Sequence, residues 1–285
     1  MNKWIKKSAI LANGTGYLDK LQSVYPVTLS EEREIPAEIV RDLKEIFEAH
    51  DNEKLVRKLL AFEKFPIKDP YVAFLRRKKG SFIKKNPETV SRIAEQLYSL
   101  GFNGMLNGIK EPKEFNRQIG TLFKRWLPNM GFPLLAVHEF ENYQGVCLLS
   151  GSDNTLKDYA QTKLGYDIEK GIDMIAKAGK IYFFLGEAKF LTDYGGHQIA
   201  QFEDAFRTAS FEKDSCVGVA ILDGVVWIKG KNKMFERICK SKHIILSALL
   251  LKDFLLEVNS KNVLALRESQ EEYGDDDNRL FDSIE

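Results

Sequence analysis

Three residues near the middle of the chain have the types and spacing that metal-assisted hydrolysis needs. Glu187 and Lys189 lie two positions apart at the end of an apolar run, residues 181–185, that predicts a buried strand. Because strand side chains alternate between faces, both charged groups project from one face. Burying a charged side chain is unfavourable unless it is paired with another group or has a function in the buried site. With Asp173 on the preceding apolar segment, 172–176, the hairpin would carry two carboxylates and an ammonium, which suits a divalent metal and phosphodiester hydrolysis.

The turn between these two strands decides whether Asp173 shares the face of Glu187. A two-residue turn at Ala178 and Gly179 would place Asp173 on the opposite face. An odd-length loop centred near Lys180, or a bulge of the kind that Gly179 favours, places both carboxylates on the same face. The hypothesis of a shared site therefore predicts an irregular hairpin.

An Asp followed after a hairpin's length by Glu-x-Lys resembles the PD-(D/E)xK nuclease superfamily. The segment Gly-Glu-Ala-Lys-Phe, residues 186–190, resembles type II restriction endonucleases in particular. The resemblance covers about residues 112 to 250 and implies an α/β fold with a restriction-endonuclease-like αβββαβ core. It implies that Asp173, Glu187 and Ala188 hold Mg²⁺ and that Lys189 orients or activates water. Ile172 stands where the superfamily pattern has its proline.

The same resemblance implies an activity and its partners. The expected enzyme is a Mg²⁺-dependent, sequence-specific endonuclease that cuts double-stranded DNA and leaves 5′-phosphates. Restriction sites are usually palindromic, which implies a homodimer with one active centre per strand, and a cognate DNA methyltransferase would share the target site. Two alternatives remain: a repair or junction-resolving nuclease of the same superfamily, and a catalytically silent DNA-binding module. The large helical N-terminal part favours the restriction enzyme, and the intact Asp, Glu and Lys set argues against the silent module.

Charge is distributed unevenly along the chain although its net value is only +1. Residues 54–125 hold 17 Lys or Arg against 6 Asp or Glu, whereas residues 267–285 hold 8 acidic residues against 2 basic ones. A dense basic cluster suits contact with a phosphate backbone, and its alternative is a solvated helix end and loop. The cluster that we expect to bind DNA consists of Arg76, Arg77, Lys78, Lys79, Lys84 and Lys85.

The segment directly after Lys189 is a second candidate for DNA contact. Residues 191–201 combine hydrogen-bonding side chains with a glycine pair that permits close backbone approach. Glutamine can read adenine in the major groove, and the start of the helix expected near Gly196 could hold a phosphate. The alternative is a polar loop that caps a helix. The side chains expected to contact DNA here are Asp193, His197, Gln198 and Gln201.

The elements that position these residues follow from apolar periodicity and turn signals. We expect a helical, basic region over residues 1–130 that contacts the DNA backbone and a possible dimer partner, a catalytic core over 131–265, and an acidic tail over 266–285. A helix starting at Asn86 should end at Gly101, and strands are expected at 134–140 and at 225–228, the latter after a hairpin turn at Asp223 and Gly224.

Other acidic residues are weaker candidates for the metal site. Glu139 or Glu141 could add a third carboxylate, although solvent-facing strand positions are the alternative. Asp167 and Glu169 could replace Asp173, but only Asp173 lies within an apolar strand. The three cysteines lack CxxC spacing, and we find neither a signal peptide nor an apolar stretch long enough to cross a bilayer, so we expect a cytoplasmic protein away from membranes.

Overall fold

The computed structural model describes residues 1–26, 33–111, 118–167, 170–179, 182–230 and 232–260. The chain divides into two compact units. The first unit combines Met1–Val27 with Phe115–Glu285, and the second is Thr28–Glu114. This division does not coincide with the boundary expected near residue 130, because both the N-terminal segment and the helix that ends at Trp126 belong to the unit that carries the sheet. The acidic tail, 266–285, lies outside the described residues.

A mixed sheet forms the centre of the first unit, which confirms an α/β fold. Strand order is β1-β2-β3-β4-β6-β5, and β7 also pairs with β6. The two longest strands, β4 and β6, are parallel and are joined through helix α10, whereas β3 and β4 form an antiparallel hairpin. The strands are β1 (Leu134–Leu135), β2 (Cys147–Leu149), β3 (Met174–Ala178), β4 (Tyr182–Leu191), β5 (Glu212–Lys213), β6 (Cys216–Gly224) and β7 (Ile244–Leu246).

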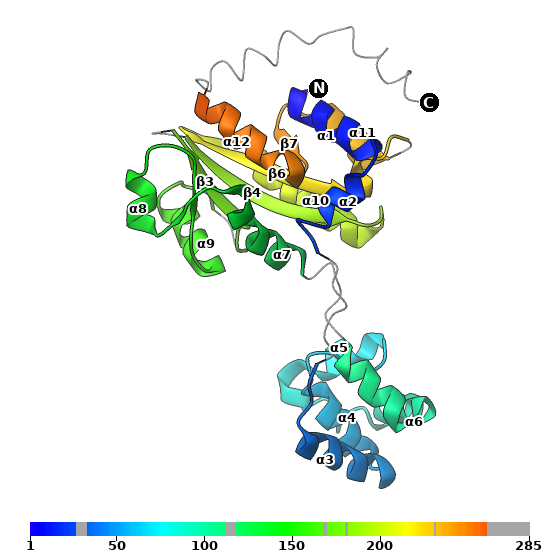
Figure 1. Cartoon of the computed structure of the whole chain (residues 1–285). Coiled ribbons are helices and arrows are strands. Elements are labelled where there is room, and N and C mark those ends of the chain that lie inside the picture. The colour runs from blue at the N-terminus through cyan, green and yellow to red at the C-terminus, as the bar shows by residue number, and fades with distance from the viewer. Residues whose placement is uncertain (27–32, 112–117, 168–169, 180–181, 231, 261–285) are drawn as a thin grey trace. The chain divides into compact units, whose positions relative to one another are not determined.

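Helices cover both faces of this sheet (Figure 1). On one face α1 and α12 pack through Trp4, Phe254 and Phe184, whose successive ring centroids are 5.4 and 5.2 Å apart. On the other face α8 and α9 meet the sheet through Phe140 and Tyr159. The helices of this unit are α1 (Lys3–Asn13), α2 (Tyr17–Leu21), α7 (Ile119–Trp126), α8 (Val137–Asn142), α9 (Asp153–Thr162), α10 (Gly196–Ala209), α11 (Lys233–Cys239) and α12 (Leu251–Ser260), with 3-10 turns at Leu127–Met130, Val225–Trp227 and Ala248–Leu250.

The β3–β4 hairpin has the irregular turn that a shared site requires. Its register pairs Met174 with Gly186 and Ala178 with Tyr182, so three residues connect the strands and the turn is centred on position 180. Gly179 has φ +66°, which favours glycine at that position. The prediction of an odd-length loop is confirmed, although Lys180 itself lies outside the described residues.

A buried carboxylate explains why the N-terminal segment joins the sheet unit. Asp223, at the end of β6, is fully buried and accepts hydrogen bonds from the hydroxyls of Tyr17 (3.0 Å), Tyr25 (3.1 Å) and Ser247 (2.5 Å) and from the N–H of Ala248 (3.1 Å). Two of these donors precede residue 28, so the end of the sheet is completed by chain from the other end of the sequence.

The predictions of strands at 134–140 and at 225–228 are wrong. The segment 134–140 pairs over only two residues before it turns into α8. After Gly224 the chain leaves the sheet as a 3-10 turn, Val225–Trp227, instead of returning as a hairpin. The reason is local, because hydrogen bonds hold the chain at this point. Asp223 is held in the interior by its four hydrogen-bond donors, and the indole N–H of Trp227 donates to the carbonyl of Leu222 at 2.6 Å, which turns the chain back on the end of β6.

The second unit is helical, as predicted. Its apolar core contains Leu43, Leu55 and Ile93, all with no exposed surface. The helix that begins at Pro87 breaks at Gly101, as predicted, where the backbone is non-helical (φ +74°, ψ 162°), and a second helical segment continues to Lys110. The elements are α3 (Ala37–Glu48), α4 (Asn52–Leu60), α5 (Pro70–Leu75), a 3-10 turn at Arg77–Gly80, and α6 (Pro87–Lys110). No helix in the described part of either unit combines the length and apolar character needed to cross a membrane.

Candidate active site

The hairpin brings together the three side chains that the sequence singles out. Asp173 directly precedes β3, and its N–H donates to the carbonyl of Gly186 at 3.1 Å. Continuing the strand register sets Asp173 opposite Glu187, so the two carboxylates share a face. Asp173 Oδ2 also accepts from the N–H of Ala188 at 3.0 Å, and Lys189 Nζ forms an ion pair with Glu187 Oε1.

This cluster is largely removed from solvent. The side chains of Asp173 and Glu187 are 14% and 11% exposed, and that of Lys189 is 20% exposed. Burial, together with the charge of Asp173, raises the pKa of Glu187 to about 7. Burial also raises the pKa of Asp173. Burial by itself would lower the pKa of Lys189, but the charges of Glu187 and Asp173 outweigh it and raise that pKa, so the lysine stays protonated.

One oxygen of the cluster lacks a protein partner. Glu187 Oε2 is buried and accepts no hydrogen bond from the residues that the structure describes. A buried carboxylate oxygen without a donor is unfavourable unless something else binds it. When Lys124 and Asp153 of the neighbouring helices are included, three carboxylates lie around two ammonium groups, so the local charge also favours a cation. The donor set fits a hard divalent ion, which prefers oxygen ligands.

Helix α7 contributes two residues that the sequence analysis missed. Gly120 lies against Asp173: a Cβ atom at this position would be 2.8 Å from Asp173 Oδ1. One turn later, Lys124 Nζ is 3.9 Å from the same oxygen and forms an ion pair with Asp153, the first residue of α9. The only sequence signal was a Gly and a Lys four positions apart, which share one face of a helix.

The segment after Lys189 forms a loop and the first turns of α10. Asp193 and His197 are exposed, and the side chain of Gln201 is 3.4 Å from the His197 ring. Gln198 is instead 6% exposed and exchanges hydrogen bonds of 3.3 Å with the backbone N–H and hydroxyl of Thr192. Gln198 therefore holds the loop and is not presented for base contact, whereas the other three expected side chains are accessible.

The basic cluster lies in the second unit, from the end of α5 through the 3-10 turn to the residues that follow it. Arg76 donates to the backbone carbonyls of Phe62 and Glu63 at 2.7 and 3.1 Å, so its guanidinium supports the fold of that unit. Exposed side chains are found at Arg77, Lys84 and Lys85, while the side chains of Lys78 and Lys79 lie outside the described residues.

The other candidate carboxylates do not join the hairpin. Glu139 and Glu141 lie on helix α8 and not on a strand, and Glu141 pairs with Lys163 at 3.0 Å. Asp167 is exposed, and Glu169 lies outside the described residues. Within the described ranges, no three His, Cys, Asp or Glu residues gather as a metal-binding group. A third carboxylate ligand thus has no support in the structure.

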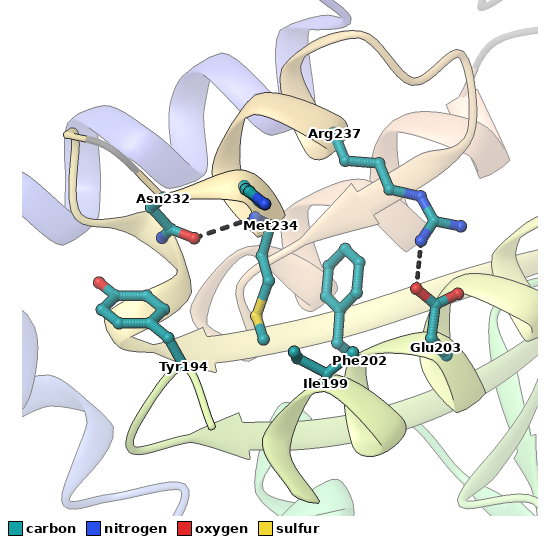
Figure 2. Close-up of a pocket in the computed structure, with 8 residues that line it drawn as sticks. Tyr194, Ile199, Phe202, Glu203, Asn232, Met234 and Arg237 are labelled. Carbon is teal, nitrogen blue, oxygen red and sulfur yellow. Dashed lines mark hydrogen bonds and ion pairs between the residues drawn. The ribbon is translucent and has the colours of Figure 1, made fainter. Parts of the chain in front are cut away.

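A separate pocket of about 380 Å³ lies between α10 and α11 (Figure 2). Tyr194, Ile199 and Met234 form much of its apolar wall, and two of its charged residues, Glu203 and Arg237, form an ion pair with each other. None of the three hairpin residues lines this pocket. It is therefore distinct from the carboxylate and lysine cluster.

Comparison with known proteins gives the family. The family model described as the Tsp45I type II restriction enzyme matches residues 2–258, a range that includes all of the second unit, most of the first, and all three hairpin residues. No match was found to a curated protein or to a solved structure. With the hairpin cluster inside a match that spans nearly the whole chain, the protein belongs to the Tsp45I type II restriction enzyme family, whose members are site-specific deoxyribonucleases that act on double-stranded DNA.

Proposed function

We propose that Asp173, Glu187 and Lys189 form the catalytic centre of a Mg²⁺-dependent restriction endonuclease of the PD-(D/E)xK type. The observation that carries the proposal is the hairpin register, which sets both carboxylates and the lysine on one face of β3 and β4. The sequence α7, β2, β3, β4, α10 and β6, with β1, α8, α9 and β5 inserted between these elements, also supports an αβββαβ core. This combination, within a family of site-specific deoxyribonucleases, supports phosphodiester hydrolysis at the hairpin.

Type II restriction enzymes typically need a divalent metal, and the residues at the hairpin fit one. Asp173 and Glu187 would hold it through carboxylate oxygens, with the Ala188 carbonyl as the third protein ligand. We favour Mg²⁺ because the donor set is all oxygen. The unpartnered Glu187 Oε2 supports this assignment. When bound, the ion supplies positive charge that stabilises the phosphate as it gains negative charge.

Lys189 would act on the attacking water or on the phosphate. Its raised pKa keeps it cationic, and its ion pair with Glu187 holds it at the carboxylate cluster. A protonated amine at this place can donate to a phosphate oxygen and position water for attack opposite the leaving oxygen. The superfamily pattern associates this arrangement with 5′-phosphate products, which we propose here too.

The remaining proposals follow from what a restriction enzyme must do. A palindromic target would be cut by a homodimer with one hairpin cluster for each strand. A DNA methyltransferase with the same target would protect the host, and both enzymes would work in the cytoplasm, where that DNA is found. The exposed cations Arg77, Lys84 and Lys85 would contact the phosphate backbone.

Cleavage of a long duplex tests the function directly. Phage-sized DNA is incubated with the protein and Mg²⁺, and the products are separated on a gel. Discrete bands whose sequenced ends share one site and carry 5′-phosphates are expected. A smear, or intact DNA under conditions where the protein binds it, would contradict site-specific cleavage.

The assignment of the catalytic residues needs matched variants. Asp173→Asn and Lys189→Met should each lower the cleavage rate by at least about a hundredfold while DNA binding persists. Lys163→Met is the control, because Lys163 forms an ion pair with Glu141, which contacts β3 at Lys177 and not at the end that carries Asp173 and Glu187. This variant should cleave like the unmodified protein. If either hairpin variant still cleaves DNA at the unmodified rate, the catalytic centre does not lie at these residues.

A further inference from the structure

Lys124 lies between two carboxylates, Asp153 and Asp173, that differ in their exposure to solvent. Its Nζ forms an ion pair with Asp153, whose side chain is 73% exposed, and lies 3.9 Å from Oδ1 of Asp173, whose side chain is 14% exposed. The lysine is itself 28% exposed. A single ammonium therefore faces one solvated partner and one buried partner.

The position of Lys124 is built into the packing of α7. Ile119 and Phe123 are buried and anchor the helix to the apolar core. Gly120 lacks the Cβ that would meet Asp173 Oδ1, so the helix backbone can approach the carboxylate closely. Residues four apart lie on the same helix face, so this approach also directs Lys124 toward Asp173.

The contact between Lys124 and Asp173 affects metal binding, because Asp173 is a ligand in the proposed catalytic centre. Asp173 is buried, and Lys124 lies within ion-pair distance of it in the described structure, 3.9 Å from Oδ1. Any divalent ion that binds Asp173 must share that carboxylate with the lysine. Asp153 offers the lysine an alternative partner that is already within ion-pair distance.

We propose that Lys124 is a positioning residue that competes with a divalent cation for Asp173, and that its ion pair with Asp153 weakens this competition. The inference rests on the proposed metal site at Asp173 and Glu187. It assigns to α7 and α9 the control of how strongly that site binds its ion. Lys124 acts through Asp173 and needs no contact with the reacting phosphate.

The proposal predicts opposite effects for the two partners. Lys124→Gln removes the competing cation, so the affinity for a divalent ion should rise by about two- to fivefold. Asp153→Asn leaves Lys124 with Asp173 as its carboxylate partner, so that affinity should fall by a similar factor. Lys124→Arg keeps the charge and should remain close to the unmodified protein. A residue that merely supported the fold would shift both variants in the same direction.

The test measures binding of Mn²⁺ alone to the full-length protein, without DNA. The concentration of free Mn²⁺ is measured by electron paramagnetic resonance at low ionic strength, where electrostatic interactions are least screened by salt. Lys163→Gln is the control, because Lys163 pairs with Glu141, which contacts β3 at Lys177 and not at the end that carries Asp173 and Glu187. The thermal midpoint of each variant is measured in parallel to establish that it is folded.

The outcomes separate this inference from the proposed function. If the unmodified protein binds Mn²⁺, Asp173→Asn abolishes binding, and Lys124→Gln and Asp153→Asn shift it in opposite directions, the proposal is supported. If binding depends on Asp173 but the two variants have equal or unchanged affinity, the role of Lys124 is overturned while the metal site stands. If Asp173→Asn leaves binding intact, both proposals fail.

Discussion

Gly120→Ala tests whether the placement of Asp173 matters for cleavage. The added Cβ would lie 2.8 Å from Asp173 Oδ1, roughly half an ångström inside ordinary van der Waals contact. The carboxylate is held on its other side, because Oδ2 accepts from the Ala188 N–H at 3.0 Å. Either the carboxylate or helix α7 must therefore move by about that amount.

The effect on stability should be small because two contributions oppose each other. Alanine is favoured over glycine inside a helix by about 1 kcal/mol. Displacing a buried carboxylate from its hydrogen bond costs about 1 kcal/mol or somewhat more. Catalysis is more sensitive to geometry, since a misplacement near 1 Å can lower a rate by about a hundredfold. We expect a fall of roughly tenfold to a hundredfold in the cleavage step with little change in the free energy of unfolding.

Single-turnover cleavage at saturating enzyme and Mg²⁺ measures the chemical step, and urea unfolding measures stability. Thr121→Ala is the matched control, because Thr121 is exposed on the same helix and its replacement also improves helix propensity. The control should cleave at the unmodified rate. If Gly120→Ala cleaves as fast as Thr121→Ala and gains the full helix-propensity stabilisation, the close approach of α7 to Asp173 has no role in the reaction.

Three further predictions concern pH, stability and salt. The pKa of Glu187 is raised from 4.5 to about 7, so its contribution to the stability of the metal-free protein is fully present below pH 4.5 and is lost as pH rises through 7. The unfolding free energy of that protein should therefore fall relative to that of Glu187→Gln as pH rises across this window, and a difference that stays constant with pH would contradict the assignment. Asp223→Asn places an amide donor among four hydrogen-bond donors and should lower the unfolding free energy in urea by about 1–3 kcal/mol; an unchanged midpoint would show that the buried cluster is dispensable. Replacing Arg77, Lys84 and Lys85 by Ala should weaken binding to every DNA sequence and make the slope of log affinity against log salt shallower by about one for each phosphate that these cations neutralise. An unchanged slope would remove these cations from the DNA interface.

The sequence by itself determined the hairpin and the pairing of its charged residues. Alternation along a strand placed Glu187 and Lys189 on one face, and the need for a shared site required an odd-length turn, which the register around position 180 confirms. These inferences succeeded because strand periodicity and turn geometry act over a few adjacent residues. Apolar spacing predicted the helices of the second unit for the same reason.

Only the tertiary structure decided which distant segments complete the site and the fold. Tyr17 and Tyr25 donate hydrogen bonds to Asp223 from about 200 positions away in the sequence, so the N-terminal segment belongs to the unit that carries the sheet. Gly120 and Lys124 reach Asp173 from another helix, and Gln198 turns inward to Thr192 although it belongs to a polar loop. No local pattern encodes such contacts, because they depend on how buried polar groups find partners once the whole chain is packed.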